Sequence, residues 1–342
     1  MNGYKVAVVG ATGLVGRTML KVLEERDFPV AWLVPIASER SAGTTVSFRG
    51  DDCRVLEISE ESFDGVDIAL FSAGGETAKR WAPIAVARGA VVIDNSSAFR
   101  MDPNVPLIVP EVNPSVLTDA SPRIIANPNC STIQMVVALQ PILANYGIHR
   151  VVVCTYQSVS GAGQNGIDQL QRELRGEDAG SRAFAHPIAD NALPHIASFD
   201  ADGFTTEERK MIEETRKIFG DQSLRVSPTC VRIPVSVSHS EAVHLELQQP
   251  YELADVRALL EDMPGVMVID DPEAAAYPLA TMAAGRDEVF VGRLRRDPSV
   301  ENGLIMWVVS DNLRKGAATN AVQIAELWRT LREKNPAPGS ES

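Results

Sequence analysis

The chain has 342 residues, of which 45% are hydrophobic and 23% charged, and its formal net charge at pH 7 is −13. This apolar content is enough for a packed core, so the composition excludes a mainly disordered chain. An acidic chain without a basic block is poorly suited to nucleic acid or an anionic membrane, although a local basic pocket for a small anion remains open. The length suggests about two domains.

The four cysteines are scattered and form no CxxC pair. This spacing does not predict a zinc module or a disulfide framework, and it fits a reducing compartment in which one cysteine can carry chemistry. The N-terminus leads into a strand pattern rather than a signal peptide, and no apolar run reaches the roughly 20 residues of a membrane helix. We therefore expect a cytoplasmic protein without a metal site.

The first third of the chain alternates short apolar runs with helical patterns. Nearly continuous apolar strands separated by helices are typical of a parallel sheet covered on both faces. Strands are predicted at 4–9, 31–36, 66–71 and 91–94, and helices at 14–26 and 77–88.

From about residue 131 the pattern changes to a mixed α+β region with an antiparallel-rich sheet. A long helix is predicted over 131–146, with Pro141 expected to kink or break it. A long strand is predicted over 150–156 and a final helix over 316–331. Other strands are expected at 231–235, 242–247, 289–293 and 304–309, and other helices at 166–174 and 206–219.

Gly10, Gly13 and Gly16 follow the first predicted strand and open the first helix. In a dinucleotide-binding turn of this kind, the first glycine permits a tight turn and the last lets helix and strand pack closely. The free N–H groups of the helix start would face the pyrophosphate. An ordinary βα turn is the alternative, but the second glycine turn at Gly74 and Gly75 favours a nicotinamide cofactor.

The segment after the second strand bears on the choice between NAD and NADP. Glu39 suits the ribose hydroxyl of NAD, whereas Arg40 suits the 2′-phosphate of NADP. Ser38, Ser41 and Thr44 surround Arg40 and would complete a phosphate site, so we predict NADP. The alternative for Arg40 is a solvated surface charge.

Cys130 is the cysteine best placed for chemistry. It lies between Asn129 and Ser131, two residue types that cap helices, at the start of the predicted long helix. A helix N-terminus favours the thiolate form. The other three cysteines, Cys53, Cys154 and Cys230, are interpreted as small buried hydrophobic residues.

Eight stretches of the sequence carry distinctive motifs, at 8–16, 69–74, 94–100, 109–113, 127–134, 156–163, 230–235 and 308–316. Together they resemble the aspartate-β-semialdehyde dehydrogenase family in its bacterial form. They follow the family's order along almost the whole chain, and the cysteine and arginine–histidine motifs are the specific ones. Asn127 departs from the pattern, since close bacterial members carry cysteine there.

The resemblance implies an α/β fold with a Rossmann-like NADP-binding domain at 1–130 and an α+β catalytic and dimerisation domain at 131–312. It also implies a C-terminal helix at 313–334 that returns to the first domain, followed by a disordered tail at 335–342. The expected assembly is a homodimer, with a tetramer left open.

The implied reaction interconverts L-aspartate 4-semialdehyde, phosphate and NADP⁺ with 4-phospho-L-aspartate and NADPH. In the cell it would run in the reductive direction and feed lysine (through diaminopimelate), threonine, methionine and isoleucine synthesis. Cys130 would form the acyl thioester, and His239 would move the proton of the hemithioacetal oxygen. Arg232 would grip the substrate carboxylate, Glu207 the ammonium, and Gln157 would orient the substrate.

The resemblance also assigns phosphate and cofactor contacts. Arg100 and Lys210 would bind phosphate, although Glu207 and Lys210 are three apart on a helix and the sequence alone favours a surface salt bridge. The expected cofactor contacts are Gly10, Thr12, Gly13, Leu14, Val15, Gly16, Ser38, Arg40, Ser41, Ser72, Gly74, Ser160, Gly161 and Asn312.

Arg232 and His239 pose a geometric problem, because seven residues of extended strand would separate them by roughly 23 Å and place them on opposite faces. Both can reach one small substrate only if the chain bends between them. Pro234 and the serines at 236, 238 and 240 are the expected places for that bend.

Three other interpretations remain open. An N-acyl-glutamyl-phosphate reductase would share the glycine turn and the cysteine chemistry but would not need an acid for a free ammonium. A catalytically silent NADP-binding paralogue would not need Cys130, Gln157, Arg232 and His239 together. A zinc site is unfavourable because Cys130 and His239 supply only two ligands.

Overall fold

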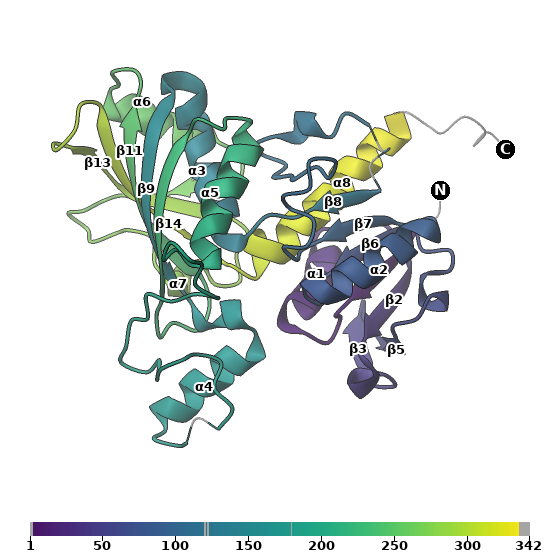
Figure 1. The fold of residues 1–342 in the computed structure, drawn as a ribbon. Coiled ribbons are helices and arrows are strands. Elements are labelled where there is room, and N and C mark those ends of the chain that lie inside the picture. Colours follow the sequence, from purple (N-terminus) through teal and green to yellow (C-terminus); the bar gives the residue numbers. More distant parts are fainter. Residues whose placement is uncertain (1–2, 120, 122, 179, 335–342) are drawn as a thin grey trace. The chain divides into compact units, whose positions relative to one another are not determined.

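The computed structural model describes residues 3–334 except 120, 122 and 179 (Figure 1). The predicted tail at 335–342 lies outside these described residues. The chain divides into two compact units, one containing the residues up to Pro128 together with those from Ala317 onward, and the other spanning Asn129–Gly316.

The first unit is built on a six-stranded parallel sheet in the order β5-β2-β1-β6-β7-β8. The strands are β1 (Tyr4–Val9), β2 (Val30–Ala37), β5 (Leu56–Glu57), β6 (Ile68–Phe71), β7 (Val91–Asp94) and β8 (Ile124–Ala126). A separate hairpin joins β3 (Thr45–Phe48) to β4 (Asp51–Arg54). The predicted parallel sheet is therefore confirmed.

Helices bury both faces of this sheet because alternate residues of each strand point to opposite sides. Val6 and Val8 of β1 pack in a core with residues of α1 (Leu14–Glu25) and α8 (Thr319–Lys334). Ala7 and Val9 pack on the other side with α2 (Gly75–Ala87). In Figure 1 the yellow α8, last in sequence, lies beside β7, so the expected return of the final helix to the first domain is confirmed.

The turn from β1 into α1 depends on two glycines. Gly10 has a φ of +86°, which favours glycine. A Cβ atom at Gly16 would lie 2.1 Å from the carbonyl oxygen of Gly10, so a side chain there would push the helix away from the turn. The two roles expected from the sequence, a tight turn and a close helix approach, are both present.

The second unit holds a mixed six-stranded sheet in the order β10-β9-β11-β14-β13-β12. The β9–β10 and β12–β13 pairs are parallel and the other three pairs are antiparallel. The strands are β9 (Ile148–Gln157), β10 (Arg225–Arg232), β11 (His239–Leu247), β12 (Val266–Val268), β13 (Val289–Asp297) and β14 (Gly303–Ser310).

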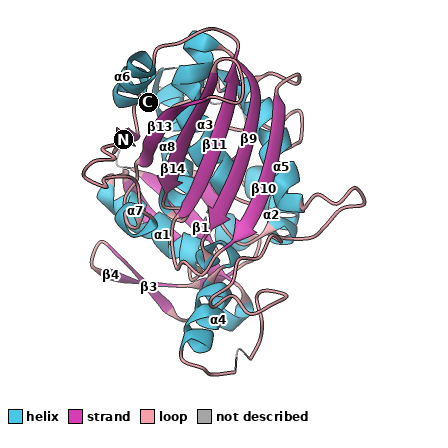
Figure 2. Ribbon diagram, turned by 90° about the vertical axis from the view of Figure 1, so that its left-hand side faces the viewer, coloured by secondary structure: helices cyan, strands magenta, loops and turns pink. Residues whose placement is uncertain are grey.

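Helices cover one face of this second sheet. Figure 2 shows the strands in front with α3 (Cys130–Tyr146) and α5 (Thr206–Phe219) behind them. α3 packs on β9, β11, β13 and β14, whereas α5 packs on β10. The remaining helices are α4 (Gln164–Leu174), α6 (Leu253–Asp262) and α7 (Ala280–Ala283), and the short helical turns lie at Glu39–Ser41, Glu61–Phe63, Pro114–Val116, Val159–Ala162 and Arg314–Ala318.

Pro141 does not break α3, which runs on to Tyr146 with Pro141 itself buried, and the alternative of a kink at this residue stays a prediction. Two other local predictions were wrong. The strand expected at 231–235 lies earlier, because β10 is an edge strand that tolerates Pro228 and ends before Pro234. The last α-helix begins at Thr319 rather than at residue 316, after a π-helical turn.

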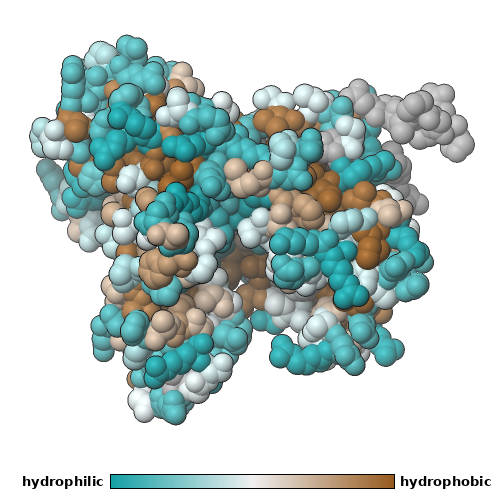
Figure 3. All heavy atoms as spheres, viewed as in Figure 1, coloured by the Kyte–Doolittle hydropathy of each residue, from teal (hydrophilic) through white to brown (hydrophobic). Residues whose placement is uncertain are grey.

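Within the part of the chain that the structure describes, no helix has the length and apolar character needed to cross a bilayer. Hydrophilic side chains cover much of the surface of both units on the face shown in Figure 3.

Replacing Gly16 by Ala should destabilise the protein by about 1–3 kcal/mol, because the new methyl group would collide with the backbone of the turn. Gly75 is the matched control, since a Cβ atom there has no neighbour within 4 Å. Gly75→Ala should leave the free energy of unfolding unchanged or slightly raised. Urea unfolding of both variants checks this, and equal stability of the two would contradict the packing argument.

Candidate active site

Three of the predicted residues lie at the same end of three neighbouring strands of the second sheet. We call these residues, Gln157, Arg232 and His239, the active-site row. Gln157 ends β9, Arg232 ends β10 directly opposite it, and His239 begins β11 on the other side of β9. The chain therefore reaches from one flank of β9 to the other within the six residues 233–238.

The bend that the sequence required is present between Arg232 and His239. Ser238 has a φ of +77°, a left-handed backbone conformation rare for serine. Both side chains converge on Gly161, where a Cβ atom would lie 2.6 Å from Nη1 of Arg232 and 3.4 Å from Nε2 of His239. The bend and the absence of a side chain at Gly161 together let the two groups share one small space.

Cys130 is the first residue of α3, as expected, but Asn129 does not cap the helix with its side chain. The Asn129 amide instead donates to Oε1 of Glu207 at 2.8 Å, and its Oδ1 accepts from the Cys130 thiol at 3.2 Å. Its backbone N–H donates to Oε2 of Glu214 at 2.7 Å. Two carboxylates of α5 thus fix the residue that precedes the thiol.

A glycine makes room for the same cysteine. A Cβ atom at Gly316 would lie 2.8 Å from the Cβ atom of Cys130. Gly316 lies in a stretch that matches the family, but it was not predicted as a site residue, and Asn129 was predicted only as a helix cap. Glu214 was not predicted at all, because its contact with Asn129 spans 85 positions and leaves no local signal in the sequence.

Glu207 is a buried carboxylate with donors from three segments. It accepts hydrogen bonds from Asn129, from Nε2 of Gln157 at 3.2 Å and from Nζ of Lys210 at 3.1 Å. Burial alone would raise the pKa of Glu207, but Lys210 and these hydrogen bonds outweigh it and lower the pKa to about 2. The salt bridge that the sequence alone favours is present, but it does not lie on the surface as expected, because the acid of the pair is only 6% exposed.

His239 is completely buried and its ring is oriented by Ser158. The backbone N–H of Ser158 donates to Nδ1 at 3.0 Å, and the Ser158 hydroxyl lies 3.1 Å from the same atom. Burial, together with the charge of Arg232, lowers the pKa of His239 to about 3. The ring is therefore neutral at pH 7, and because Nδ1 accepts, Nε2 carries the proton.

Arg232 brings a buried positive charge to the row. Its Nη1 donates to the backbone oxygen of Ser158 at 2.6 Å, and its guanidinium lies 5.7 Å from the ring centre of Phe184. Nε of Arg232 and Nε2 of His239 are buried without a hydrogen-bond partner among the described residues. Two unpaired donors beside a fixed positive charge suit an anionic or carbonyl-containing ligand.

Asn312 connects the serines beside this row. Its Oδ1 accepts from the hydroxyls of Ser158 and Ser160 and from the backbone N–H of Ser238 at 2.9–3.2 Å. The expected cofactor residues Ser160, Gly161 and Asn312 thus lie in the second unit, next to His239. Their role toward the cofactor stays a prediction.

The remaining expected cofactor residues belong to the first unit. Gly10, Thr12, Gly13, Leu14, Val15 and Gly16 follow β1, Ser38, Arg40 and Ser41 follow β2, and Ser72 and Gly74 follow β6. These are the carboxyl ends of adjacent parallel strands, where dinucleotides bind in open α/β sheets. Gly74 precedes α2 with a φ of +86°.

The two predicted phosphate ligands belong to different units. Arg100 is buried in the first unit, where it donates to the backbone oxygens of Asn127 and Asn95. Lys210 belongs to the second unit and pairs with Glu207. Their joint binding of phosphate stays a prediction.

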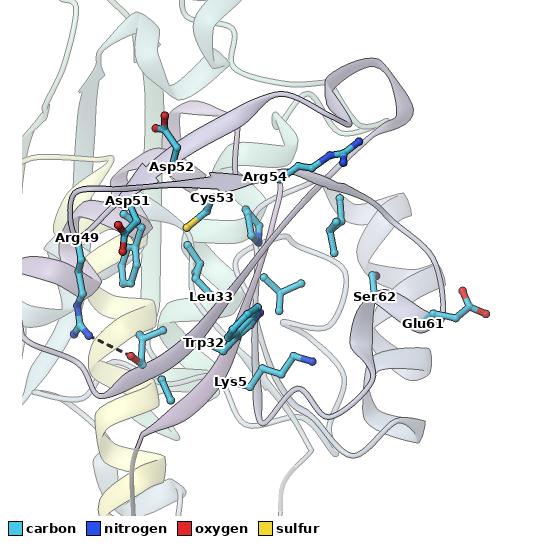
Figure 4. Close-up of a pocket in the computed structure, with 16 residues that line it drawn as sticks. Lys5, Trp32, Leu33, Arg49, Asp51, Asp52, Cys53, Arg54, Glu61 and Ser62 are labelled. Atoms are coloured by element: carbon cyan, nitrogen blue, oxygen red, sulfur yellow. Dashed lines mark hydrogen bonds between the residues drawn. The ribbon is translucent and has the colours of Figure 1, made fainter.

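A cavity of about 730 Å³ lies elsewhere in the first unit, between β2 and the β3–β4 hairpin. Figure 4 shows Trp32, Leu33 and Cys53 around it. None of the predicted site residues lines this cavity. Among the described residues, no group of three or more His, Cys, Asp or Glu side chains is arranged to hold a metal ion.

Comparison with known proteins assigns both units to one class of enzyme. Residues 5–120 match the model for the semialdehyde dehydrogenase NAD binding domain, and residues 139–315 match that for the semialdehyde dehydrogenase dimerisation domain. These matches define the chain as a semialdehyde dehydrogenase.

Individual relatives narrow the class. Aspartate-semialdehyde dehydrogenase from Aquifex aeolicus is 58% identical over 95% of this chain and 98% of its own. The enzyme from Bacillus subtilis is 51% identical over 96% and 99% of the two chains. The crystal structure of aspartate semialdehyde dehydrogenase II from Vibrio cholerae, complexed with ASA, matches 98% of this chain and all of its own with a TM-score of 0.93 at 50% identity. The chain belongs to the aspartate-semialdehyde dehydrogenase family, which confirms the resemblance.

Acid should destabilise this protein partly through His239. The pKa of about 3 in the folded state is below the usual 6.5, so between these values the unfolded state binds a proton that the folded state does not. Stability contributed by the neutral ring is therefore lost as pH falls from 6.5 toward 3. We expect His239→Gln to lose less stability than the wild type between pH 7 and pH 4 in urea unfolding. Equal losses would show that His239 is not held neutral.

Proposed function

We propose that this protein catalyses the NADPH-dependent reductive dephosphorylation of 4-phospho-L-aspartate to L-aspartate 4-semialdehyde through a thioester at Cys130. The observation that carries the proposal is the grouping of one thiol, one buried cation and one buried anion in the second unit. Cys130 and Glu207 both hydrogen-bond the side chain of Asn129. Glu207 also accepts a hydrogen bond from Gln157, which pairs with Arg232 on the neighbouring strand. The relatives' names support aspartate semialdehyde as the product.

Charge supports a substrate with a free amino-acid end. Arg232 can hold a carboxylate through two parallel N–H bonds, and Glu207, charged at neutral pH, can hold an ammonium. An N-acylated substrate has no ammonium and would leave this buried carboxylate without that partner. The alternative N-acyl-glutamyl-phosphate reductase is therefore less favourable.

The Cys130 thiolate would attack the acyl phosphate, so that a C–S bond forms while the C–O bond to the leaving phosphate breaks. The cofactor would supply the hydride that reduces the thioester carbonyl, and the C–S bond would then break to release the aldehyde and return Cys130 to its thiolate form. Nε2–H of His239 would hydrogen-bond the oxygen on which negative charge develops in the tetrahedral intermediate. Gln157 would keep the reacting carbon near the thiol.

The turn after β1 fits a nicotinamide dinucleotide, because Gly10 and Gly16 bring the backbone close and no side chain caps α1. When bound, the cofactor supplies the hydride. We propose NADP, which is also present in the solved Candida albicans aspartate semialdehyde dehydrogenase, 26% identical over 96% of this chain and 99% of its own with a TM-score of 0.77. Arg40, with Ser38 and Ser41 beside it, would bind the 2′-phosphate.

The family also suggests a phosphate site, an assembly, a location and a pathway for this protein. Phosphate would bind to Arg100 and Lys210. The chain would act as a homodimer in the cytoplasm, where its product would feed the synthesis of lysine, threonine, methionine and isoleucine. The matched dimerisation domain supports the dimer. The face of the second sheet opposite α3, with Ile305, Trp307 and Tyr277 around a 450 Å³ hollow, would be its interface.

Replacing Cys130 by Ser should lower kcat by on the order of a thousandfold or more, because a serine hydroxyl ionises far less readily than a thiol at neutral pH. The variant should still bind NADP⁺, as followed by fluorescence titration. Near-normal turnover in a spectrophotometric assay would exclude the thioester route and would favour a different chemistry at this site.

Replacing Arg40 by Ala should raise KM for NADP⁺ roughly ten- to a hundredfold, since a hydrogen bond to a charged group contributes about 1.5–3 kcal/mol. KM for NAD⁺ should hardly change. A wild-type preference for NAD⁺ would instead make Glu39 the determinant, and equal losses with both cofactors would mean that Arg40 only supports the local fold.

A further inference from the structure

A layer of buried side chains lies directly beneath the active-site row. Two residues deeper along the same three strands, Cys230 pairs with Thr155, and Thr155 pairs with Glu241. Residues two apart on a strand face the same side, so Glu241 faces α3 as His239 does. The mechanism proposed above assigns no part to this glutamate.

Polar atoms of Glu241 and of two residues on α3 are unpaired among the described residues. Glu241 is completely buried, and among the described residues no donor meets hydrogen-bond geometry at either carboxyl oxygen, although the Gln134 side chain lies close enough to affect its pKa. The same absence of a partner holds for both amide atoms of Gln134 and for the Ser131 hydroxyl, which are 0–1% exposed on α3. Ser131 and Gln134 are three apart and share one side of the helix.

These five atoms call for a partner, because buried polar groups are nearly always bonded to the protein or to an ordered water molecule. Water suits them, since it donates and accepts and can bridge a carboxyl, an amide and a hydroxyl at once. Ser131 directly follows Cys130, and Gln134 lies one helical turn after Cys130. A water molecule bound to both side chains would therefore fix the position of the first turn of α3.

The charge state of Glu241 fits such a bridge. Burial raises the pKa of Glu241 well above its usual range, and the facing amide of Gln134 offsets this only in part. From β10 the facing titratable group is Cys230, whose pKa is also raised by burial and by nearby glutamates, so it brings no positive charge. An uncharged carboxyl can both donate and accept a hydrogen bond.

We propose that Glu241 is a positioning residue for Cys130: with Gln134 and Ser131 it binds an ordered water molecule between β11 and α3, and this cluster fixes the helical turn that presents the thiol. The inference rests on the proposed role of Cys130 as nucleophile. Its test therefore includes a readout that needs no substrate.

The experiment compares Glu241→Gln with Glu241→Leu in the full-length enzyme. The readouts are kcat, KM for aspartate semialdehyde, and the pH profile of Cys130 alkylation by iodoacetamide, resolved by peptide mass spectrometry. Glutamine can donate and accept hydrogen bonds as a neutral carboxylic acid does, so Glu241→Gln should stay within about twofold of wild-type kcat with an unchanged alkylation profile. Leucine at position 241 cannot form these bonds, so Glu241→Leu should shift the Cys130 thiol and lower kcat about ten- to a hundredfold. The alkylation midpoint of Glu241→Leu should shift while its KM changes little.

Val243→Ala is the matched control, because Val243 is buried two residues farther along the same face of β11 and carries no polar atom. It should lower the melting temperature without moving the alkylation midpoint. If Glu241→Leu does not fold, Gln134→Met removes the same cluster from the helix side and should give the same kcat loss and the same shift.

Two results would overturn the proposal. One is a wild-type alkylation profile and kcat in Glu241→Leu or in Gln134→Met. The other is a loss in Glu241→Gln as large as in Glu241→Leu, which would mean that the charge is needed rather than the bridge. Both are distinct from failure of the proposed function, which would appear as retained turnover in Cys130→Ser.

Discussion

Keeping the Glu207 carboxylate charged inside the protein is the constraint on which the candidate site depends. A buried charge is tolerated only when its oxygens are bonded and a counter-charge lies near. Glu207 meets this condition with donors from three segments: Asn129 before α3, Gln157 at the end of β9 and Lys210 on its own helix. The same hydrogen bonds that keep it ionised therefore fix the residue next to the thiol and the end of the central strand.

A second set of hydrogen bonds maintains the strained crossing from β10 to β11. Ser158 binds Arg232 through its backbone oxygen and His239 through its backbone N–H, and Asn312 binds the backbone N–H of Ser238. These bonds hold the left-handed conformation of Ser238 in place. A cation and a neutral imidazole can then lie side by side, and the cation helps keep the imidazole uncharged.

Local signals predicted the parts of the structure that local chemistry decides. The parallel sheet of the first unit followed from continuous apolar strands, and the Gly10–Gly16 turn followed from backbone geometry. Strand geometry predicted that the chain must bend between Arg232 and His239. The route of the connecting segment could not be predicted, because this route depends on β9 lying between β10 and β11. Burial of Glu207 could not be predicted, since it arises from the packing of α5 on α3 and β10. The small β3–β4 hairpin and Glu214 gave no recognisable pattern.

The central claim is that the site acts on a free amino-acid semialdehyde rather than on an N-acylated one. The most direct measurement follows NADP⁺ reduction by the purified protein with L-aspartate 4-semialdehyde or with N-acetyl-L-glutamate 5-semialdehyde, each with and without phosphate. We predict rapid reduction of NADP⁺ with aspartate semialdehyde when phosphate is present, and little reduction with the N-acetylated aldehyde. Comparable or faster turnover of the N-acetylated substrate would contradict it, as would the absence of any turnover with either aldehyde.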